Sequence, residues 1–546
     1  MNKRTRQLER EMMFREIKRP SIAVNENFID RAIEFISPVQ ALKRRQSRMV
    51  LALTGGYKGA SKSRRGLSEY NPKSGSADAD INYDLPTLRD RSRDLVRNNP
   101  LGGGAISTTV NSVVGTGIRL NARVNRDILG MTPDEAKEFE RQAEYGFGLW
   151  AEGCDIERAL SFYEMQELAF RSTLENGDVV VLLPYQRRQD DAFGLKLQAV
   201  EADRLCNPNS GMDTDTMSGG VELDEVGAPK KYHILSVHPG DYGKAGKREW
   251  KDYPAFASDG RPNVLHLFRK LRAGQHRGVP YLAPVIESLK QIERYSDAEL
   301  MAAVVAGMFT VFLQSESGEE FAPMMPTSET GATSADEDIK LDYGAVVSLA
   351  QGDTISTANP GRPNAQFDPF VQAIYRQIGV ALELPYEMLV KHFTSSYSAA
   401  RAAILEAWRF FLSRRAWLTR SFCQPVYRAW MTEAIASGYL YAPGFFDSPY
   451  YRAAYLGAEW IGPTQGQIDP VKEVQAAEKR IGLGLSTRSE ESVAITGTDW
   501  ESKVPQMKYE NELMKEINGG FVPSKDEPEP EENEEKEEDD EEEEKK

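Results

Sequence analysis

One long apolar stretch limits what this chain can become. Residues 300–313 read LMAAVVAGMFTVFL, fourteen positions without a charged side chain. The stretch is too short to cross a bilayer, which takes ~20 residues of helix. It continues a helical pattern that opens at Pro284, in which Leu289, Ile292 and Tyr295 recur at helical spacing. A helix that is apolar all round must be covered, so we predict a long helix buried in a core or between subunits.

The charges of the chain are unevenly placed. The net charge is −16 over 546 residues, yet residues 1–65 carry 16 Lys and Arg against 6 Asp and Glu. Residues 525–546 carry 15 acidic residues against 4 Lys, which leaves −15 on the 459 residues between. Proteins that grip duplex DNA usually present a basic face, because affinity comes from neutralising phosphates. The acidic residues 66–524 therefore do not favour a protein that binds duplex DNA through a basic face. The tail, residues 525–546, has no apolar side chain with which to fold.

The periodicities predict a helix-rich α+β fold. Helices are expected over 133–153, 162–176 and 366–382, and strands within 177–185 and 195–205, with a hairpin over 219–235. A break is expected at Asn98-Asn99-Pro100. After an exposed excursion at 314–343 and a strand at 344–350, the longest helical pattern begins near Ser396. Pro425 should kink or restart it, and Gly438 should end it.

Hydroxyl side chains beside a histidine raise the question of catalysis. The segment contains Lys391, His392, Thr394, Ser395, Ser396 and Ser398. The sequence lacks the GxSxG and SxxK patterns of serine nucleophiles. We therefore interpret Ser396 and Ser398 as the polar start of a helix, where side-chain oxygens accept from unpaired backbone N–H groups. A hydrolase that uses Ser398 remains a remote alternative.

Metal and cofactor chemistry find little support. The five histidines show no HxxxH or HExxH spacing, and three scattered cysteines do not make a disulfide framework or a zinc site. We predict no catalytic, cofactor or metal residues. The first residues lack the apolar core of a secretory signal, and a reducing cytoplasm fits the cysteine count best. The Gly-rich turn RAGQHRGVPYLAP groups Arg272, His276 and Arg277, either for packing or for contact with a neighbouring subunit or nucleic acid.

Seven segments, taken in order, resemble the lambda-type portal proteins of tailed bacteriophages. They are RDLVRNNP with VVGTGI (93–118), VEADRL (200–205), GVELDEVGAPKKYHIL (220–235), RAGQHRGVPYLAPVIESLKQIERYSDAELMAA (272–303), LELPYEML (382–389), SYSAARAAILEAWRFF (396–411) and WIGPTQGQIDPVKEVQAAEKRIGLGLST (460–487). Each segment alone is weak evidence, but the ordered set spans most of the chain.

The resemblance implies a ring of twelve identical subunits around a DNA channel, with no enzymatic activity and no cofactor. The ring would occupy one capsid vertex of the virion after assembly in the host bacterial cytoplasm. Its implied partners are the terminase large subunit, the major capsid protein and scaffold, the head–tail adaptor, and double-stranded DNA bound without sequence specificity. A head–tail adaptor or minor capsid protein is the alternative interpretation.

The resemblance also divides the chain into the regions of a portal. These are a basic arm and linker (1–83), wing (84–283), stem helix (284–313), clip (314–365), return stem helix and tunnel loop (366–396), long tunnel or wing helix (397–439), crown (440–520) and disordered acidic tail (521–546). The implied channel loop contains Lys391, His392, Thr394, Ser395 and Ser396. The implied subunit-interface or stem residues are Arg272, Arg277, Tyr295, Leu300, Val305 and Met308.

Overall fold

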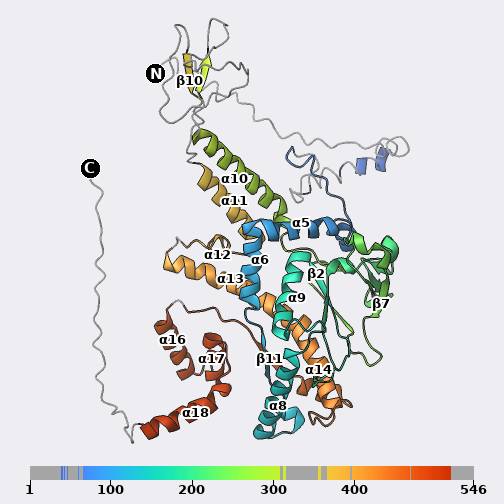
Figure 1. The fold of residues 1–546 in the computed structure, drawn as a ribbon, viewed down its shortest axis with the longest axis vertical. Coiled ribbons are helices and arrows are strands. Elements are labelled where there is room, and N and C mark those ends of the chain that lie inside the picture. The colour runs from blue at the N-terminus through green and yellow to red at the C-terminus, as the bar shows by residue number, and fades with distance from the viewer. Residues whose placement is uncertain are drawn as a thin grey trace, which may run out of the picture. The chain divides into compact units, whose positions relative to one another are not determined.

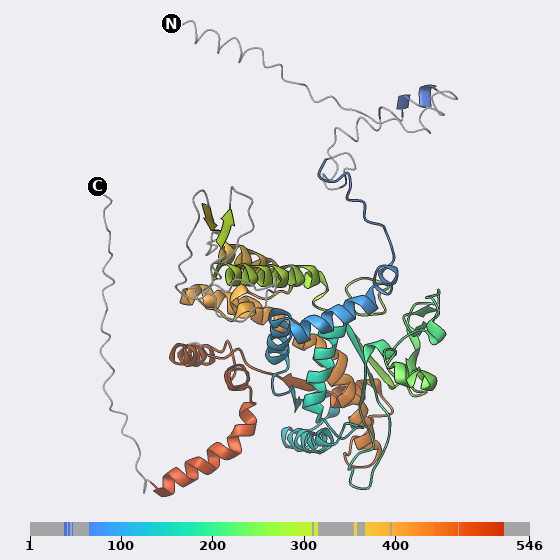
Figure 2. The same ribbon diagram turned by 45° about the horizontal axis from the view of Figure 1, so that its top comes forward.

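The computed structural model describes most of the chain beyond residue 65. The described residues are 65–307, 311–314, 354–357, 366–393, 396–467 and 469–517, with a few positions between 38 and 60. The chain divides into two units, residues 1–75 and residues 76–546, and the elements below belong to the second (Figures 1 and 2). Helix α4 (Ala77–Ile81) lies at the start of the second unit.

The first half of this unit is mostly helical, and capping residues mark where several of its helices begin. The elements are α5 (Leu85–Asn98), α6 (Pro100–Val113), β1 (Arg119–Ala122), α7 (Arg126–Leu129), α8 (Pro133–Glu152) and α9 (Phe162–Asn176). The predicted break between α5 and α6 is confirmed, because the Asn99 side chain accepts hydrogen bonds from the first N–H groups of α6. Reciprocal capping pairs, Thr132 with Glu135 and Ser161 with Glu164, start α8 and α9 close to where the sequence predicts them.

Two antiparallel sheets follow α9. In the first, β2 (Asp178–Leu182) lies between β3 (Gln198–Val200) and β8 (Val264–Phe268). The second has the order β4 (Met217–Ser218), β5 (Val221–Leu223), β6 (Pro229–Leu235), β7 (Trp250–Pro254). The predicted strands and hairpin are confirmed. Strand β2 is buried along its whole length, since α9 packs against it and its apolar side chains join the cores on both sides.

The main core joins elements that are far apart in the sequence. Phe147 on α8 packs edge to face against Tyr427 and Trp430 of α14 (Gln424–Ala436), with ring centroids 5.6 and 5.4 Å apart. Phe162 at the start of α9 completes the cluster, with its ring centroid 5.4 Å from that of Phe147. Burying each such aromatic side chain contributes about 1.5–3 kcal/mol. The cluster therefore fixes α8, α9 and α14 as one body.

The long carboxy-terminal helical pattern is divided at the predicted proline. Helix α13 (Tyr397–Leu418) passes through a π-helical turn, Thr419–Cys423, into α14, whose first turn contains Pro425. Proline has no N–H for the helical ladder, so the pattern restarts there. Gly438 adopts a positive φ of 79° just after α14, which confirms the predicted end.

The last elements return to the body before a final helical group. They are α15 (Pro449–Tyr455), β11 (Ala458–Ile461), α16 (Pro470–Gly482), α17 (Arg488–Thr496) and α18 (Trp500–Ile517). Strand β11 pairs with β1, Trp460 opposite Leu120, and Phe445 and Tyr455 lie in the main core. The segment from α15 through β11 thus packs with the first half of this unit.

The predicted single helix through residue 313 is wrong. Helix α10 spans Ile286–Gly307, after a 3-10 turn at Ala283–Val285, and Val311–Gln314 forms strand β9. This strand pairs with β10 (Thr354–Thr357) in antiparallel register. Glycine weakens a helix, and the β-branched and aromatic residues after Gly307 favour an extended strand. The predicted excursion at 314–343 lies outside the described residues except for Gln314, and the predicted strand at 344–350 lies wholly outside them.

Candidate functional site

One side of helix α10 is uncovered in the single chain. Leu300 and Met301 are 65% and 62% exposed, and Val304 is 46% exposed. Tyr295, earlier on the same helix, stacks on Phe367 of α11 (Phe367–Ala381), with ring centroids 5.4 Å apart. Helix α11 thus covers part of α10, and α11 itself matches the predicted helix over 366–382. The exposure of Leu300, Met301 and Val304 does not fit the predicted alternative that this part of the helix is buried in a core of the same chain.

Two more of the predicted interface or stem residues lie at or beyond the described end of α10. Val305 belongs to α10, but the structure does not describe its side chain, and Met308 lies outside the described residues. Arg272 pairs with Asp80 of α4, with 2.6 Å between Nη1 and Oδ2. Only Leu300 and Tyr295 are therefore placed on α10 by their side chains.

A fully buried carboxylate lies at the base of α10. Asp178, the first residue of β2, accepts hydrogen bonds from Arg89 Nη2 at 2.7 Å and from Arg277 Nε at 2.7 Å. The Gly278 amide and His266 Nε2 complete its shell, at 3.1 and 3.3 Å. We call Asp178, Arg89, Arg277, His266 and Gly278 the Asp178 cluster. It joins α5, β2 and β8 to the loop that enters α10.

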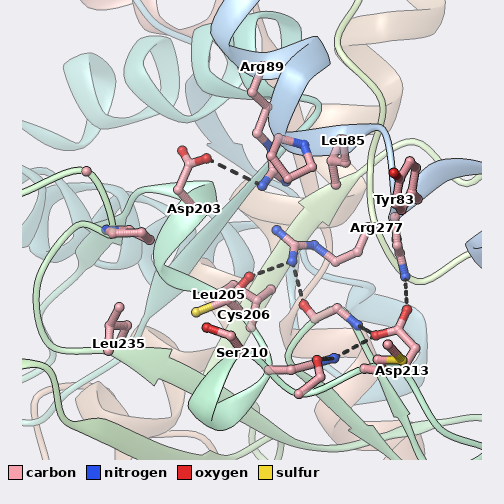
Figure 3. A pocket seen from close by; sticks show the side chains of 18 of the residues that line it. Tyr83, Leu85, Arg89, Asp203, Leu205, Cys206, Ser210, Asp213, Leu235 and Arg277 are labelled. Carbon is pink, nitrogen blue, oxygen red and sulfur yellow. Dashed lines mark hydrogen bonds and ion pairs between the residues drawn. The ribbon is translucent and has the colours of Figure 1, made fainter.

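The two guanidinium groups of the cluster also donate hydrogen bonds to backbone carbonyls (Figure 3). Arg277 also donates to the carbonyls of Leu205 at 2.6 Å, Ala202 at 2.8 Å, and Gly219. Arg89 also donates to the carbonyls of Asn176 and Ala202, at 2.9 and 3.3 Å. Arg277 is 3% exposed, so the packing alternative is right for this residue and its assignment to the subunit interface is wrong. Asp178 was missed by sequence reasoning, although an aspartate opening the apolar run VVVLL is a usable signal.

Burial and pairing oppose each other in the titration of this cluster. Burial alone would raise the pKa of Asp178, but Arg277 and Arg89 hold it well below its usual value. Burial lowers the pKa of Arg89 to about 10 in spite of Asp178, so the guanidinium stays charged at neutral pH. Burial also lowers the pKa of His266, against the raising effect of Asp178. The imidazole is therefore neutral at pH 7 and uses Nε2–H to donate to the carboxylate.

The predicted channel loop follows a short helix. Helix α12 (Tyr386–Val390) ends at Lys391, which adopts the left-handed conformation with φ 54°. Lys391 and His392 are exposed, whereas Thr394 and Ser395 lie outside the described residues. The two side chains therefore lie at the surface of the subunit.

The prediction that the serines begin a helix is confirmed, because α13 starts directly after Ser396, but the described residues do not form the predicted capping hydrogen bond. Ser396 precedes α13, but its hydroxyl accepts no capping hydrogen bond from the described residues of the helix. Ser398 lies inside the first turn of α13 and is exposed. Among the described residues of this stretch, no hydrogen bond joins Ser398 to His392, and such a bond would be the first requirement of a nucleophile and its base.

No group of three or more His, Cys, Asp or Glu side chains among the described residues is arranged to hold a metal ion. None of the described helices has the length and apolar character needed to span a membrane.

A model of the lambda family of phage portal proteins matches residues 63–415 of the chain. The chain belongs to the lambda family of phage portal proteins. This confirms the resemblance found in the sequence, and it sets aside the head–tail adaptor and minor capsid interpretations. The family is structural rather than enzymatic, which disfavours the hydrolase alternative together with the position of Ser398.

Two curated portal proteins are similar over most of their length. The portal protein of Escherichia phage N15 is 29% identical over 470 residues, which cover 82% of this chain and 87% of that protein. Portal protein B of Escherichia phage lambda is 28% identical over 480 residues, which cover 84% and 89%. Among solved structures, a chain in the neck of an empty GTA particle, computed with C6 symmetry, matches with a TM-score of 0.43 at 14% identity, covering 80% of this chain and 100% of that one.

Proposed function

We propose that this portal protein forms a closed ring of twelve identical subunits, through which double-stranded DNA enters and leaves the capsid. The ring occupies one vertex of the virion and nucleates head assembly in the host bacterial cytoplasm. It binds the terminase large subunit during packaging and the head–tail adaptor afterwards, and it contacts the major capsid protein and the scaffold. Membership of the portal family supports these assignments.

The proposal of a ring rests on the exposed apolar face of α10. Leu300, Met301 and Val304 lie along one stretch of a helix whose neighbouring face packs on α11 within the same chain. Covering an apolar side chain of this size contributes about 1.5–3 kcal/mol. In a ring, each subunit both covers a neighbour and is covered by one, so the gain is repeated at every interface.

We assign the regions of a portal to the described elements. The stem is α10 with α11, and the clip lies between β9 and β10, where terminase and adaptor would bind. The wing includes α5 to β8, together with α14 and the segment through β11. The crown is reduced to α16, α17 and α18, and the acidic tail follows it.

Leu300→Glu is expected to abolish ring formation while leaving the subunit folded. The side chain is exposed in the single chain, so the charge is tolerated there, but a neighbour would bury it unpaired. Mass photometry should show rings for the unmodified protein and monomers for the variant, with circular dichroism unchanged. Leu300→Met is the matched control and should still form rings. Monomers from the unmodified protein at micromolar concentration, or rings from Leu300→Glu, would contradict the proposal.

We also propose that Lys391 and His392 face the channel. One exposed lysine per subunit, repeated round a ring, makes a belt of weak phosphate contacts that carry no sequence information. Lys391→Glu should leave rings intact but lower the amount of DNA packaged or retained several-fold in a head-filling assay. Lys251→Glu, an exposed lysine on β7 of the wing, is the charge-matched control. Equal packaging and equal retention by Lys391→Glu and the unmodified protein would remove this assignment.

A further inference from the structure

The last three helices of the chain have little apolar contact with the rest of the subunit. We call α16, α17 and α18, with the turns between them, the C-terminal helical group (residues 469–517). Among the described residues, none after Trp460 belongs to either hydrophobic core or packs against one. Within the described part of the group, only Ala477 and Glu491 are buried, and Glu491 accepts two hydrogen bonds of 2.7 Å from Arg480. Apolar burial, the main favourable contribution to folding, therefore does little to fix this group in place.

Three ion pairs join the C-terminal helical group to the elements before it. Arg123, directly after β1, has Nη2 3.1 Å from Asp499 Oδ1 and Nη1 3.7 Å from Glu501 Oε2. Lys137 of α8 places Nζ 3.7 Å from the same Oε2. Asp499 is itself fixed within the group, because it accepts hydrogen bonds from Ser489 Oγ at 2.8 Å and from the amide of Glu501 at 3.2 Å. Arg123 thus holds the group at the point where α17 and α18 meet.

Two glutamates of α8 lie at the same junction. Glu144 Oε1 accepts a hydrogen bond from the amide of Ala122, and Glu140 Oε1 accepts one from the amide of Val124, both at 2.8 Å. The two carboxylates therefore bind the backbone on either side of Arg123. They hold the end of β1 on α8, and they bring two further negative charges close to the ion pairs.

The titration of these two glutamates reveals repulsion from the C-terminal helical group. Burial raises the pKa of Glu140 and of Glu144 above the usual value, and the charge of Glu501 on the first and of Asp499 on the second adds to the rise. A group that raises the pKa of a neighbouring carboxyl does so by repelling its charged form. Ionised Glu140 and Glu144 therefore push against the group that the three ion pairs hold.

We propose that the C-terminal helical group is a movable unit, closed onto α8 and β1 by the ion pairs of Arg123 and Lys137 and released when those charges are screened. Ion pairs with this much exposed side chain are individually weak, and two of the three are 3.7 Å long. Repulsion from α8 lowers their net effect further. Such an equilibrium responds to any agent that favours one of its two states. The unit moves in a free subunit as well as in a ring, so it adds a conformational device that does not depend on ring formation.

A distance between two spin labels measures whether the unit is closed. Gln142→Cys on α8 and Lys508→Cys on α18 carry the labels, since both side chains are exposed. Cys206→Ser removes the half-exposed native cysteine, whereas Cys154 and Cys423 are buried and stay unlabelled. The labelled full-length chain is mixed with an excess of unlabelled chain, so that the measured distance lies within one subunit.

Raising sodium chloride from ~0.1 M to ~1 M shortens the screening length from about 10 Å to about 3 Å. We expect this change to replace a narrow, short distance with a broad, longer distribution. Arg123→Gln should lower the ratio of closed to open several-fold already at the lower salt concentration. Arg126→Gln is the matched control, because Arg126 lies beside Asp127, at 3.8 Å, and should leave the ratio unchanged. Glu140→Gln combined with Glu144→Gln removes the repulsion and should raise the salt concentration needed to open the unit.

The same distance at both salt concentrations, whether short or long, would overturn the movable unit. An unaltered salt response in Arg123→Gln would overturn its role as the latch, and an unaltered response in the double glutamine variant would overturn the repulsion from α8. Glu501→Gln removes a charge from the opposite side of the junction at a partly exposed position. It should open the unit at lower salt, and it keeps the test decisive if Arg123→Gln fails to fold.

Discussion

Asp178→Asn should destabilise the subunit by about 3–5 kcal/mol, the cost of removing one partner from a buried ion pair. Asp178 is wholly buried, and its carboxylate balances Arg89 and Arg277. The amide that replaces it carries no charge and offers a single acceptor oxygen in place of two. Arg277 cannot escape to solvent, because three backbone carbonyls hold its guanidinium inside the chain. The variant therefore retains two buried cations without a buried anion between them.

Denaturant unfolding followed by circular dichroism measures this cost, at equal protomer concentration so that assembly contributes equally. Asp90→Asn is the matched control, since Asp90 is exposed and follows Arg89 on α5. The control should lie within about 0.5 kcal/mol of the unmodified protein. If the free energy of unfolding of Asp178→Asn also lies within about 0.5 kcal/mol of that of the unmodified protein, the cluster does not stabilise the base of α10.

Gly278→Ala is expected to cost about 3 kcal/mol, at the upper end of what overpacking usually costs. A Cβ built at Gly278 would lie 2.0 Å from the carbonyl oxygen of Gly177, a backbone atom that cannot rotate away. Gly177 is itself held at φ 91° where α9 ends. The two glycines thus let the loop that enters α10 contact the end of α9 backbone to backbone. Any shift at Gly278 also lengthens the hydrogen bond from its amide to Asp178.

Gly104→Ala is the control for the glycine substitution. Gly104 lies in α6, and a Cβ there meets none of the described atoms within 4 Å. Alanine should stabilise that helix by about 0.5–1 kcal/mol. Thermal unfolding of both variants measures the difference, and a Tm for Gly278→Ala at or above that of the unmodified protein would show that the close contact relaxes freely.

Local patterns predicted the local structure well. Helices α8, α9 and α11 were placed to within a residue or two, because a proline, a capping residue or a regular apolar period marks each of them. The break before α6 and the restart at Pro425 were predicted for the same reason, since proline acts through its own missing N–H. The strand that follows α10 was missed because an apolar run reads alike as helix and strand.

Contacts between residues that are far apart in the chain could not be predicted from the sequence. Asp178 is 89 residues from Arg89 and 99 from Arg277, and no spacing rule connects positions that only the fold brings together. Arg277 was therefore assigned to the subunit interface, although its Gly-rich turn folds inward. The portal family could be recognised from the sequence because the resemblance rests on short motifs in a fixed order. It does not depend on knowing which residues contact each other.

The pairing of β1 with β11 affects when the subunit can finish folding. Arg119 lies opposite Ile461, so β1 leaves the ribosome more than 300 residues before its partner strand exists. At ~5–20 residues per second, that interval lasts on the order of tens of seconds. Tyr427 and Trp430, which close the aromatic core around Phe147, also arrive late. Such long sequence separations slow folding, and a nascent chain holds an open strand edge and an incomplete core until translation is nearly over. A chain that stops before β11 therefore lacks both the partner strand of β1 and a strand that the finished subunit needs to close this edge.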